Sequence, residues 1–259
     1  MLEGFRVLEI CDESGVLAGR ILADLGADVV KLEAPGGDRA ARRGPFLDAI
    51  EDPERSLVWL AANASKRGIT LDCAQSEGRA ILARLLGRFD VLLETFEPGT
   101  LDSWGFDADT LARLHPRLVR CAITPFGQTG PYAMHRAGDF MLAAMAGAAP
   151  SDVDAAGPGL APPDAYQLAA LEAALGIVLA LLGRESSGRG DLVDVSLYEC
   201  RRSARAHGGD AVVAHGFGPG ARPEGRCRAP RVGEHNRDVY RDAGISEAEL
   251  SRLVAAGVI

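Results

Sequence analysis

The stretch FRVLEICDESGVLAGRILADLGADVVKLE, residues 5–33, decides the fold. Its first part, 5–11, is mostly apolar and predicts a strand. The turn-forming residues 12–15 follow, and 16–26 carry apolar residues at helical spacing, which predicts a helix. A second strand is predicted over 28–33. The order of strand, turn, helix and strand is typical of a unit whose two strands lie parallel in one sheet.

The same order recurs further along the chain. Residues 68–72 predict a strand, 76–89 a helix and 90–94 a strand, and a helix around 109–114 leads into a strand over 117–124. This alternation predicts an α/β fold, a Rossmann-like parallel sheet covered by helices in a single large domain with C-terminal helices. Ligands of such folds bind at the carboxyl ends of the strands. The sequence has no G-x-G-x-x-G or Walker A loop, so no motif supports a dinucleotide or P-loop site.

Three parts are expected along the chain. Residues 1–200 form the large domain, and 201–231, which are rich in Gly, Pro and Arg and have little periodicity, form an irregular connector. Residues 232–259 form a C-terminal helical segment that packs back on the large domain. Within this segment, Ser246 followed by Glu249 predicts a capping box at the start of a helix.

The composition is ordinary for a globular protein, because 47% of the 259 residues are hydrophobic and 25% are charged. A formal net charge of -8 argues against nucleic acid and anionic membranes as partners. The longest apolar stretch, 168–182, contains Glu172 and is shorter than a membrane span, so it predicts a buried helix. Widely spaced cysteines and an N-terminus without a signal sequence predict a cytoplasmic protein. The spacing of His and Cys predicts no metal site.

Several segments, taken in order, resemble the class III CoA-transferases, the formyl-CoA and carnitine-CoA transferase group of CaiB/BaiF type. These segments are LGADVVKLEAPGGD (25–38), NASKRGITLD (63–72), DVLLETFEPG (90–99), FGQTGPY (126–132) with Asp139, and GRGDLVDVS (188–196). Two further segments resemble the C-terminal segment of the family, APRVGEH (229–235) and GISEAEL (244–250). The resemblance implies a Rossmann-like large domain and a reaction that moves CoA from an acyl-CoA donor to a small carboxylic acid.

Asp139 stands at the start of an apolar run, 140–147, behind a turn rich in Gly and Pro. An ordinary N-cap is the commonest role for Asp at such a place, although a carboxylate at a helix N-terminus also stays ionised when it is partly dehydrated. The resemblance implies the role of a nucleophile. Asp139 would attack the acyl-CoA thioester to form a mixed anhydride, and the released CoA thiolate would return to form an aspartyl-CoA thioester. An acceptor carboxylate then takes over the CoA, so acyl-CoA is a substrate and the reaction needs no metal.

The resemblance also implies contacts with the phosphates of CoA. The motif N-x-x-K-R begins at Asn63 and places Lys66 and Arg67 near the nucleotide; from the residues alone, these two are equally well a solvated charged turn. Other expected contacts are Ser14, Gly15 and Val16, where the family has Ala-Gly-Pro beside the CoA. The same cleft is expected to include Thr95, Thr124, Phe126, Gly127 and Gln128.

The family has a smaller domain in the place where this sequence has its short connector. Family subunits are threaded through each other in pairs, so the resemblance implies a homodimer, or a separate partner protein that completes the site. Two other functions stay open. One is an acyl-CoA-binding or partner-binding subunit without transferase activity, and the less favoured one is an acyl-thioester isomerase or racemase. Racemisation needs two bases, yet Gly138 stands where related racemases have a His, and Asp164 is the only carboxylate near the second position.

Overall fold

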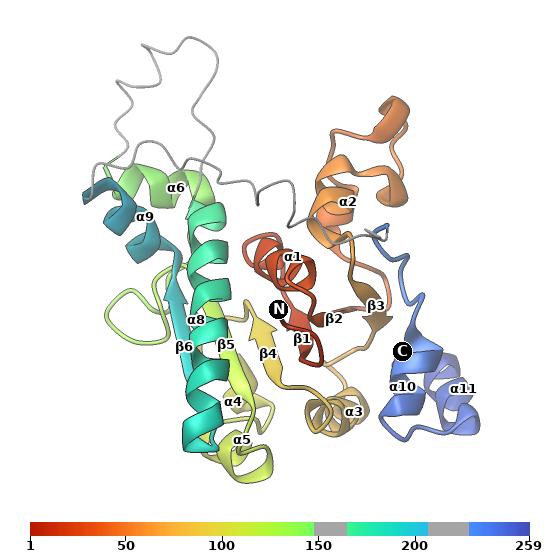
Figure 1. The fold of residues 1–259 in the computed structure, drawn as a ribbon. Coiled ribbons are helices and arrows are strands. Elements are labelled where there is room, and N and C mark those ends of the chain that lie inside the picture. Colours follow the sequence, from red (N-terminus) through yellow and green to blue (C-terminus); the bar gives the residue numbers. More distant parts are fainter. Residues whose placement is uncertain (148–164, 207–227) are drawn as a thin grey trace.

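The computed structural model describes residues 1–147, 165–206 and 228–259, and it contains a six-stranded sheet whose neighbouring strands are all parallel (Figure 1). The strands are β1 (Arg6–Ile10), β2 (Asp28–Glu33), β3 (Arg67–Thr70), β4 (Val91–Glu94), β5 (Val119–Thr124) and β6 (Leu192–Ser196). Their order in the sheet is β3-β2-β1-β4-β5-β6. This is the order of a doubly wound Rossmann-type sheet, and it confirms the predicted α/β fold.

Helices cover both faces of this sheet (Figure 1). One core contains residues of α1 (Val16–Asp24), α6 (Asp139–Met145), α8 (Ala165–Ser187) and α9 (Leu197–Ala206). The other core contains residues of α3 (Ser76–Leu86), α4 (Thr100–Ser103), α5 (Ala108–Leu114), α10 (Asn236–Asp242) and α11 (Glu247–Ala255). The segment between β2 and β3 forms η1 (Arg39–Arg42), η2 (Leu47–Ala49), η3 (Pro53–Arg55) and α2 (Leu57–Asn63), and α2 packs against α1.

Alternate side chains of each strand enter different cores, because successive residues of a strand point to opposite faces of the sheet. Val7 of β1 packs with α1 and α8, whereas Leu8 packs with α3 and the C-terminal helices. Glu9 comes next and lies under α1, where a Cβ added at Gly19 would stand 1.6 Å from its Oε2. Lys31 of β2 is also fully buried. The strands β1 and β2 therefore carry charged side chains into the interior.

The helix α8 has one buried face and one exposed apolar face. Ala169, Ala173 and Ile177 are fully buried, and the helix packs against α1, β5 and β6. By length and composition α8 could cross a membrane, with a mean hydropathy of 1.9 over its most apolar window, of which 39% is buried. Core helices of soluble proteins meet the same criterion, so this property does not by itself indicate a membrane.

The C-terminal helices α10 and α11 pack against the edge of the sheet formed by β3 (Figure 1). The Tyr240 hydroxyl donates to the Thr70 carbonyl at 2.6 Å, and the Asp72 amide donates to the Val258 carbonyl at 2.8 Å. The Ser246 hydroxyl accepts a hydrogen bond from the Glu249 amide at 3.2 Å, which confirms the predicted cap of α11. Most of the predicted connector, residues 207–227, lies outside the described residues, so the three-part organisation stays a prediction.

Candidate active site at the carboxyl edge of the sheet

A cavity of about 330 Å³ lies at the carboxyl ends of β1, β4 and β5. Its walls include Asp12 and Ser14 after β1, Thr95 after β4, and His135 in the segment after β5. β1 and β4 are neighbours in the sheet although they are not consecutive in the sequence, so the strand order reverses between them. Ligands of doubly wound sheets bind at this point of reversal. The cavity is therefore the first place at which a ligand is expected.

The turn Asp12–Gly15 forms one wall of this cavity. The Asp12 amide donates to Thr95 Oγ1 at 2.9 Å, and the Ser14 amide donates to Asp12 Oδ1 at 2.9 Å. Gly15 lies so close to β4 that an added Cβ would stand 2.5 Å from Thr95 Cγ2, so the turn requires glycine at this position. The predicted contacts Ser14, Gly15 and Thr95 therefore lie together.

A wider groove of about 790 Å³ contains Asp139. Asp139 is the first residue of α6, and its Oδ1 accepts a hydrogen bond of 2.9 Å from the amide of Ala165, the first residue of α8. The carboxylate thus belongs to the first turn of α6 and contacts the N-terminus of α8, and helix N-termini stabilise negative charge. Val16, another predicted site residue, lines the same groove. Asp164, which precedes Ala165 in the sequence, lies outside the described residues.

Tyr166 lines both the cavity and the groove. Its side chain is half-buried. Burial is the largest influence and raises the pKa of Tyr166, and the carboxylates of Glu13 and Asp12 raise it further. The hydroxyl therefore stays protonated near neutral pH and acts as a hydrogen-bond donor between the two hollows.

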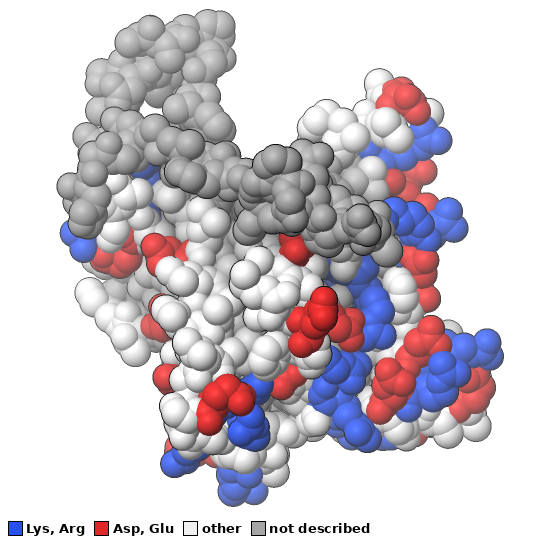
Figure 2. Space-filling model, viewed as in Figure 1, with Lys and Arg blue, Asp and Glu red and all other residues white. Residues whose placement is uncertain are grey.

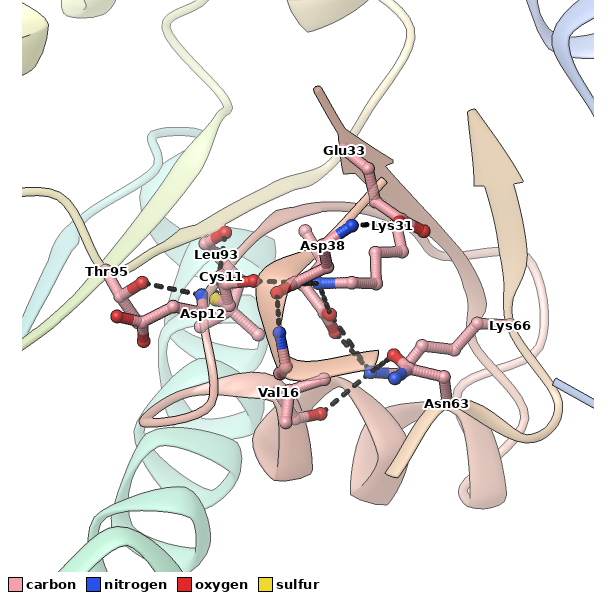
Figure 3. Close-up of polar contacts among 12 residues, drawn as sticks. Cys11, Asp12, Val16, Lys31, Glu33, Asp38, Asn63, Lys66, Leu93 and Thr95 are labelled. Atoms are coloured by element: carbon pink, nitrogen blue, oxygen red, sulfur yellow. Dashed lines mark hydrogen bonds and ion pairs between the residues drawn. The ribbon is translucent and has the colours of Figure 1, made fainter. Parts of the chain in front are cut away.

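Beneath these hollows, Glu9, Lys31 and Lys66 form a buried cluster. Lys66 Nζ lies 2.7 Å from Glu9 Oε2, and Lys31 Nζ lies 3.5 Å from Glu9 Oε1, with all three side chains inaccessible to solvent. Asn63 Oδ1 accepts a further hydrogen bond from Lys66 Nζ at 3.1 Å, and Asp38 lies 3.3 Å from Lys31 Nζ (Figure 3). This cluster was not predicted from the sequence. Since buried charges are paired in folded proteins, charged residues inside predicted strands indicate that partners are needed, but they do not identify those partners.

The pKa values of the two lysines of the cluster are shifted in opposite directions. Burial is the largest influence on both and lowers the pKa of Lys66 to about 8. For Lys31, the nearby carboxylates of Glu9, Asp38 and Glu33 outweigh burial, so its pKa is raised. The predicted contact of Lys66 with a CoA phosphate stays a prediction, and it would require the ammonium to leave Glu9.

The low pKa of Lys66 predicts how stability depends on alkaline pH. Between pH 8 and 10.5 the unfolded chain holds a proton on this side chain that the folded protein has released. The Lys66 contribution to the free energy of unfolding therefore rises with pH in this window, by up to about 1.4 kcal/mol per pH unit. Urea unfolding should give a free energy of unfolding for the wild type that increases, relative to that of Lys66→Met, as the pH is raised through this window. A difference that stays constant across the window would contradict the assignment.

The remaining predicted CoA contacts lie around the ends of β5 and β6. The Gln128 amide donates to Asp194 Oδ2 at 3.0 Å, and Gly127 packs beside the same carboxylate. The ring of Phe126 contacts those of Tyr132 and Tyr198. Thr124 is buried, and its hydroxyl has no hydrogen-bond partner within the part of the chain that the structure describes. These residues shape the turn after β5, and none of the four lines the cavity or the groove.

The predicted contact Arg67 and a second cation, Arg43, lie away from the cavity. Arg67 binds Asp28 through Nε at 2.8 Å, and Asp28 begins β2, so this pair lies at the amino edge of the sheet. Arg43 lines the groove and forms an ion pair with Glu13. Arg136, which the sequence did not single out, is exposed on the wall of the cavity. Among residues 1–147, 165–206 and 228–259, no group of three or more His, Cys, Asp or Glu side chains is placed to hold a metal ion.

Known proteins similar to this chain are CoA-transferases. The chain is 37% identical over 202 residues to the succinyl-CoA:(R)-benzylsuccinate CoA-transferase subunit BbsE of Thauera aromatica, a match that covers 77% of this chain and 49% of that protein. It is 40% identical over 201 residues to formyl-CoA:oxalate CoA-transferase of Streptomyces coelicolor, covering 76% and 47%. The chain thus spans about half the length of the curated relatives it matches.

A solved structure agrees with this similarity. The crystal structure of a CAIB/BAIF family protein from Brucella suis matches with a TM-score of 0.70 and 34% sequence identity, over 80% of this chain and 55% of that one. A sequence model described as CoA-transferase family III matches residues 2–241. The chain belongs to CoA-transferase family III.

Proposed function

We propose that this chain carries the acyl-CoA site of a CoA-transferase at the carboxyl edge of its sheet. The observation that carries the proposal is the pair of hollows that share Tyr166, one at the reversal of strand order and the other containing Asp139. CoA would enter the first hollow, and its thioester carbon would lie beside the second. Family membership supports the reaction class, and the two adjoining hollows support a site for an extended substrate.

In the proposed reaction, Asp139 attacks the thioester carbon of acyl-CoA and expels the CoA thiolate, which leaves a mixed anhydride. The thiolate then attacks the aspartyl carbonyl, releases the donor acid and forms an aspartyl-CoA thioester. The acceptor carboxylate attacks this thioester, expels the CoA thiolate again and gives a second anhydride. The thiolate finally attacks the acyl carbonyl of the acceptor, which forms the new acyl-CoA and frees the Asp139 carboxylate. Each step exchanges one activated carboxyl group for another, so no metal or ATP is required. In this proposal the Tyr166 hydroxyl, which lines the same groove as Asp139, would donate a hydrogen bond to the developing oxyanion.

Trapping of the intermediate tests this proposal. The relative BbsE is named for succinyl-CoA, so succinyl-CoA is a suitable first donor for an assay against a panel of small carboxylic acids. Hydroxylamine added during turnover should convert an aspartyl thioester into a hydroxamate, which peptide mass spectrometry locates on Asp139. Adduct formation on Asp164 would keep the reaction class and move the nucleophile to that residue. Binding of succinyl-CoA without any adduct would favour a CoA-ester-binding subunit, the second candidate.

We further propose that the protein forms a homodimer through the exposed face of α8. Leu171, Leu175, Leu179 and Leu182 are exposed by 50–68%, and the surface over α8 is largely uncharged (Figure 2). Two antiparallel copies of this helix would place Leu171 opposite Leu182 and Leu175 opposite Leu179. The stripe is therefore complementary to itself, which a two-fold symmetric interface requires. The name of BbsE as a subunit is consistent with an assembled enzyme.

A charge in this stripe should prevent the dimer. We expect light scattering to give a dimer mass for the wild type and a monomer mass for Leu175→Glu, because the substitution would bury two carboxylates without partners. Val254→Glu is the matched control, since Val254 on α11 is 53% exposed and Leu175 is 55% exposed. If the wild type is a monomer, and Leu175→Glu leaves binding to neutral phospholipid vesicles unchanged, neither a second copy nor a membrane covers this face. Vesicle binding that Leu175→Glu abolishes would assign the face to a membrane instead.

A further inference from the structure

The turn Asp12–Gly15 is held at both ends by buried lysines. Lys31 Nζ donates to the Cys11 carbonyl, immediately before the turn, at 2.7 Å. Lys66 Nζ donates to the Val16 carbonyl, immediately after the turn, also at 2.7 Å. Figure 3 shows the two side chains approaching these carbonyls from β2 and from the segment that leads into β3. The strand β2 and the segment that leads into β3 thereby fix the position of a turn to which neither of them is directly connected.

Glu9 neutralises both lysines from within the sheet. Its carboxylate lies within 3.5 Å of Lys31 Nζ and within 2.7 Å of Lys66 Nζ. Asn63 adds a hydrogen bond to Lys66, and Asp38 adds a second anion beside Lys31. Each ammonium therefore has its charge compensated and its donors directed inward, which is the condition for a buried charge to be stable.

The turn that these lysines hold contributes to both hollows of the site. Asp12 and Ser14 line the cavity, whereas Glu13 and Val16 line the groove. We propose that Lys31 and Lys66 are positioning residues that hold the turn Asp12–Gly15 in the shape that binds acyl-CoA. This inference rests on the proposed function, and it gives the lysines an internal role in place of direct contact with phosphate. Their contribution is preorganisation of a backbone turn whose shape would otherwise have to be selected on binding.

Hydrogen exchange tests the part of this inference that needs no activity. The amides of Gly15 and Val16 both donate to the Asp12 carbonyl, so their exchange reports whether the turn is closed. In Lys31→Met and Lys66→Met, we expect these amides to exchange about tenfold faster or more, while amides of β5 keep their protection. Lys66→Gln, which keeps a neutral donor, should restore part of the protection. Arg184→Met is the matched control. Arg184 is also a buried cation, but it donates to the Arg117 carbonyl and to Asp90, and neither of these groups belongs to the turn.

Calorimetry with coenzyme A tests the link to the site. We expect the dissociation constant to rise about tenfold in Lys31→Met and Lys66→Met and to stay unchanged in Arg184→Met. Unchanged exchange at Gly15 and Val16 in both lysine variants would overturn the inference, and so would faster exchange with unchanged affinity. If Lys66→Met fails to fold, Lys66→Gln and Lys31→Met decide the same question. A wild type that binds no coenzyme A would instead reject the proposed function, and the exchange result would still show whether the lysines hold the turn.

Discussion

Replacement of Asp139 by Asn should reduce the turnover of acyl-CoA by roughly a thousandfold or more, because the proposed nucleophile is lost while the shape of the side chain is kept. The amide oxygen of Asn can still accept the hydrogen bond that the Ala165 amide gives to Asp139 Oδ1 at 2.9 Å. The start of α8 should therefore remain in place, and the thermal unfolding of the variant should change little. Steady-state kinetics and hydroxylamine trapping on the same preparation measure the two expected losses, of rate and of adduct.

Two further variants serve as a control and as a test of an alternative nucleophile. Glu185→Gln removes an exposed carboxylate that lines neither hollow and should leave the rate within a few-fold of the wild type. Asp164→Asn tests the neighbouring aspartate, which directly precedes Ala165 in the sequence. If Asp139→Asn keeps its adduct and most of its rate while Asp164→Asn loses both, Asp139 serves to cap α8 and Asp164 is the nucleophile.

The fold could be predicted from the sequence because its periodicities are local. The β-turn-α-β order of residues 5–33 and its recurrence required parallel strands, and the sheet has them. The strand β6 and the helix α2 were not predicted. Leu192–Ser196 has charged or polar residues between its apolar ones and only one buried position, Val195, because β6 is an edge strand of the sheet. Leu57–Asn63 is a short helix that Ser56 caps through a hydrogen bond to the Trp59 amide.

The candidate site was less predictable, because the direction of a side chain depends on distant parts of the chain. Lys66 and Arg67 are neighbours in one motif, yet Lys66 points inward to Glu9 and Arg67 points to Asp28 at the opposite edge of the sheet. The motif indicates two cations, and their different partners appear only in the folded structure, where Lys66 precedes β3 and Arg67 begins it. Glu9 and Lys31 belong to the cluster through contacts between strands, which no spacing along the sequence reveals. The position of Asp139 at the start of a helix could be predicted because its setting, an apolar run behind a turn, is local. Its role as a nucleophile rests on the resemblance and stays a prediction.

Glu9→Gln should lower the free energy of unfolding by about 3–5 kcal/mol near neutral pH, the range seen when one partner of a buried ion pair is removed. The substitution keeps the size of the side chain, so little of the loss comes from a cavity. It leaves the ammonium groups of Lys31 and Lys66 inside the protein without the carboxylate that lies between them. Urea unfolding at a fixed pH measures the change. Glu185→Gln is the control, since Glu185 and Arg117 form a pair that is more than half exposed, and it should change stability by less than about 1 kcal/mol.

A triple variant in which Glu9, Lys31 and Lys66 are all Met separates two effects of this cluster. One is its contribution to the free energy of unfolding, and the other is its effect on the turn Asp12–Gly15. Apolar replacement of an entire buried ion group is often neutral or stabilising, so this variant should unfold within about 2 kcal/mol of the wild type even though Glu9→Gln alone does not. It has no donors for the Cys11 and Val16 carbonyls, so the turn Asp12–Gly15 should exchange rapidly and coenzyme A should bind weakly. A stable protein with a disordered turn would mean that the charges are retained for the shape of the site. A triple variant as unstable as Glu9→Gln would mean that the cluster contributes to stability through its packing and hydrogen bonds, and that its effect on the turn is secondary.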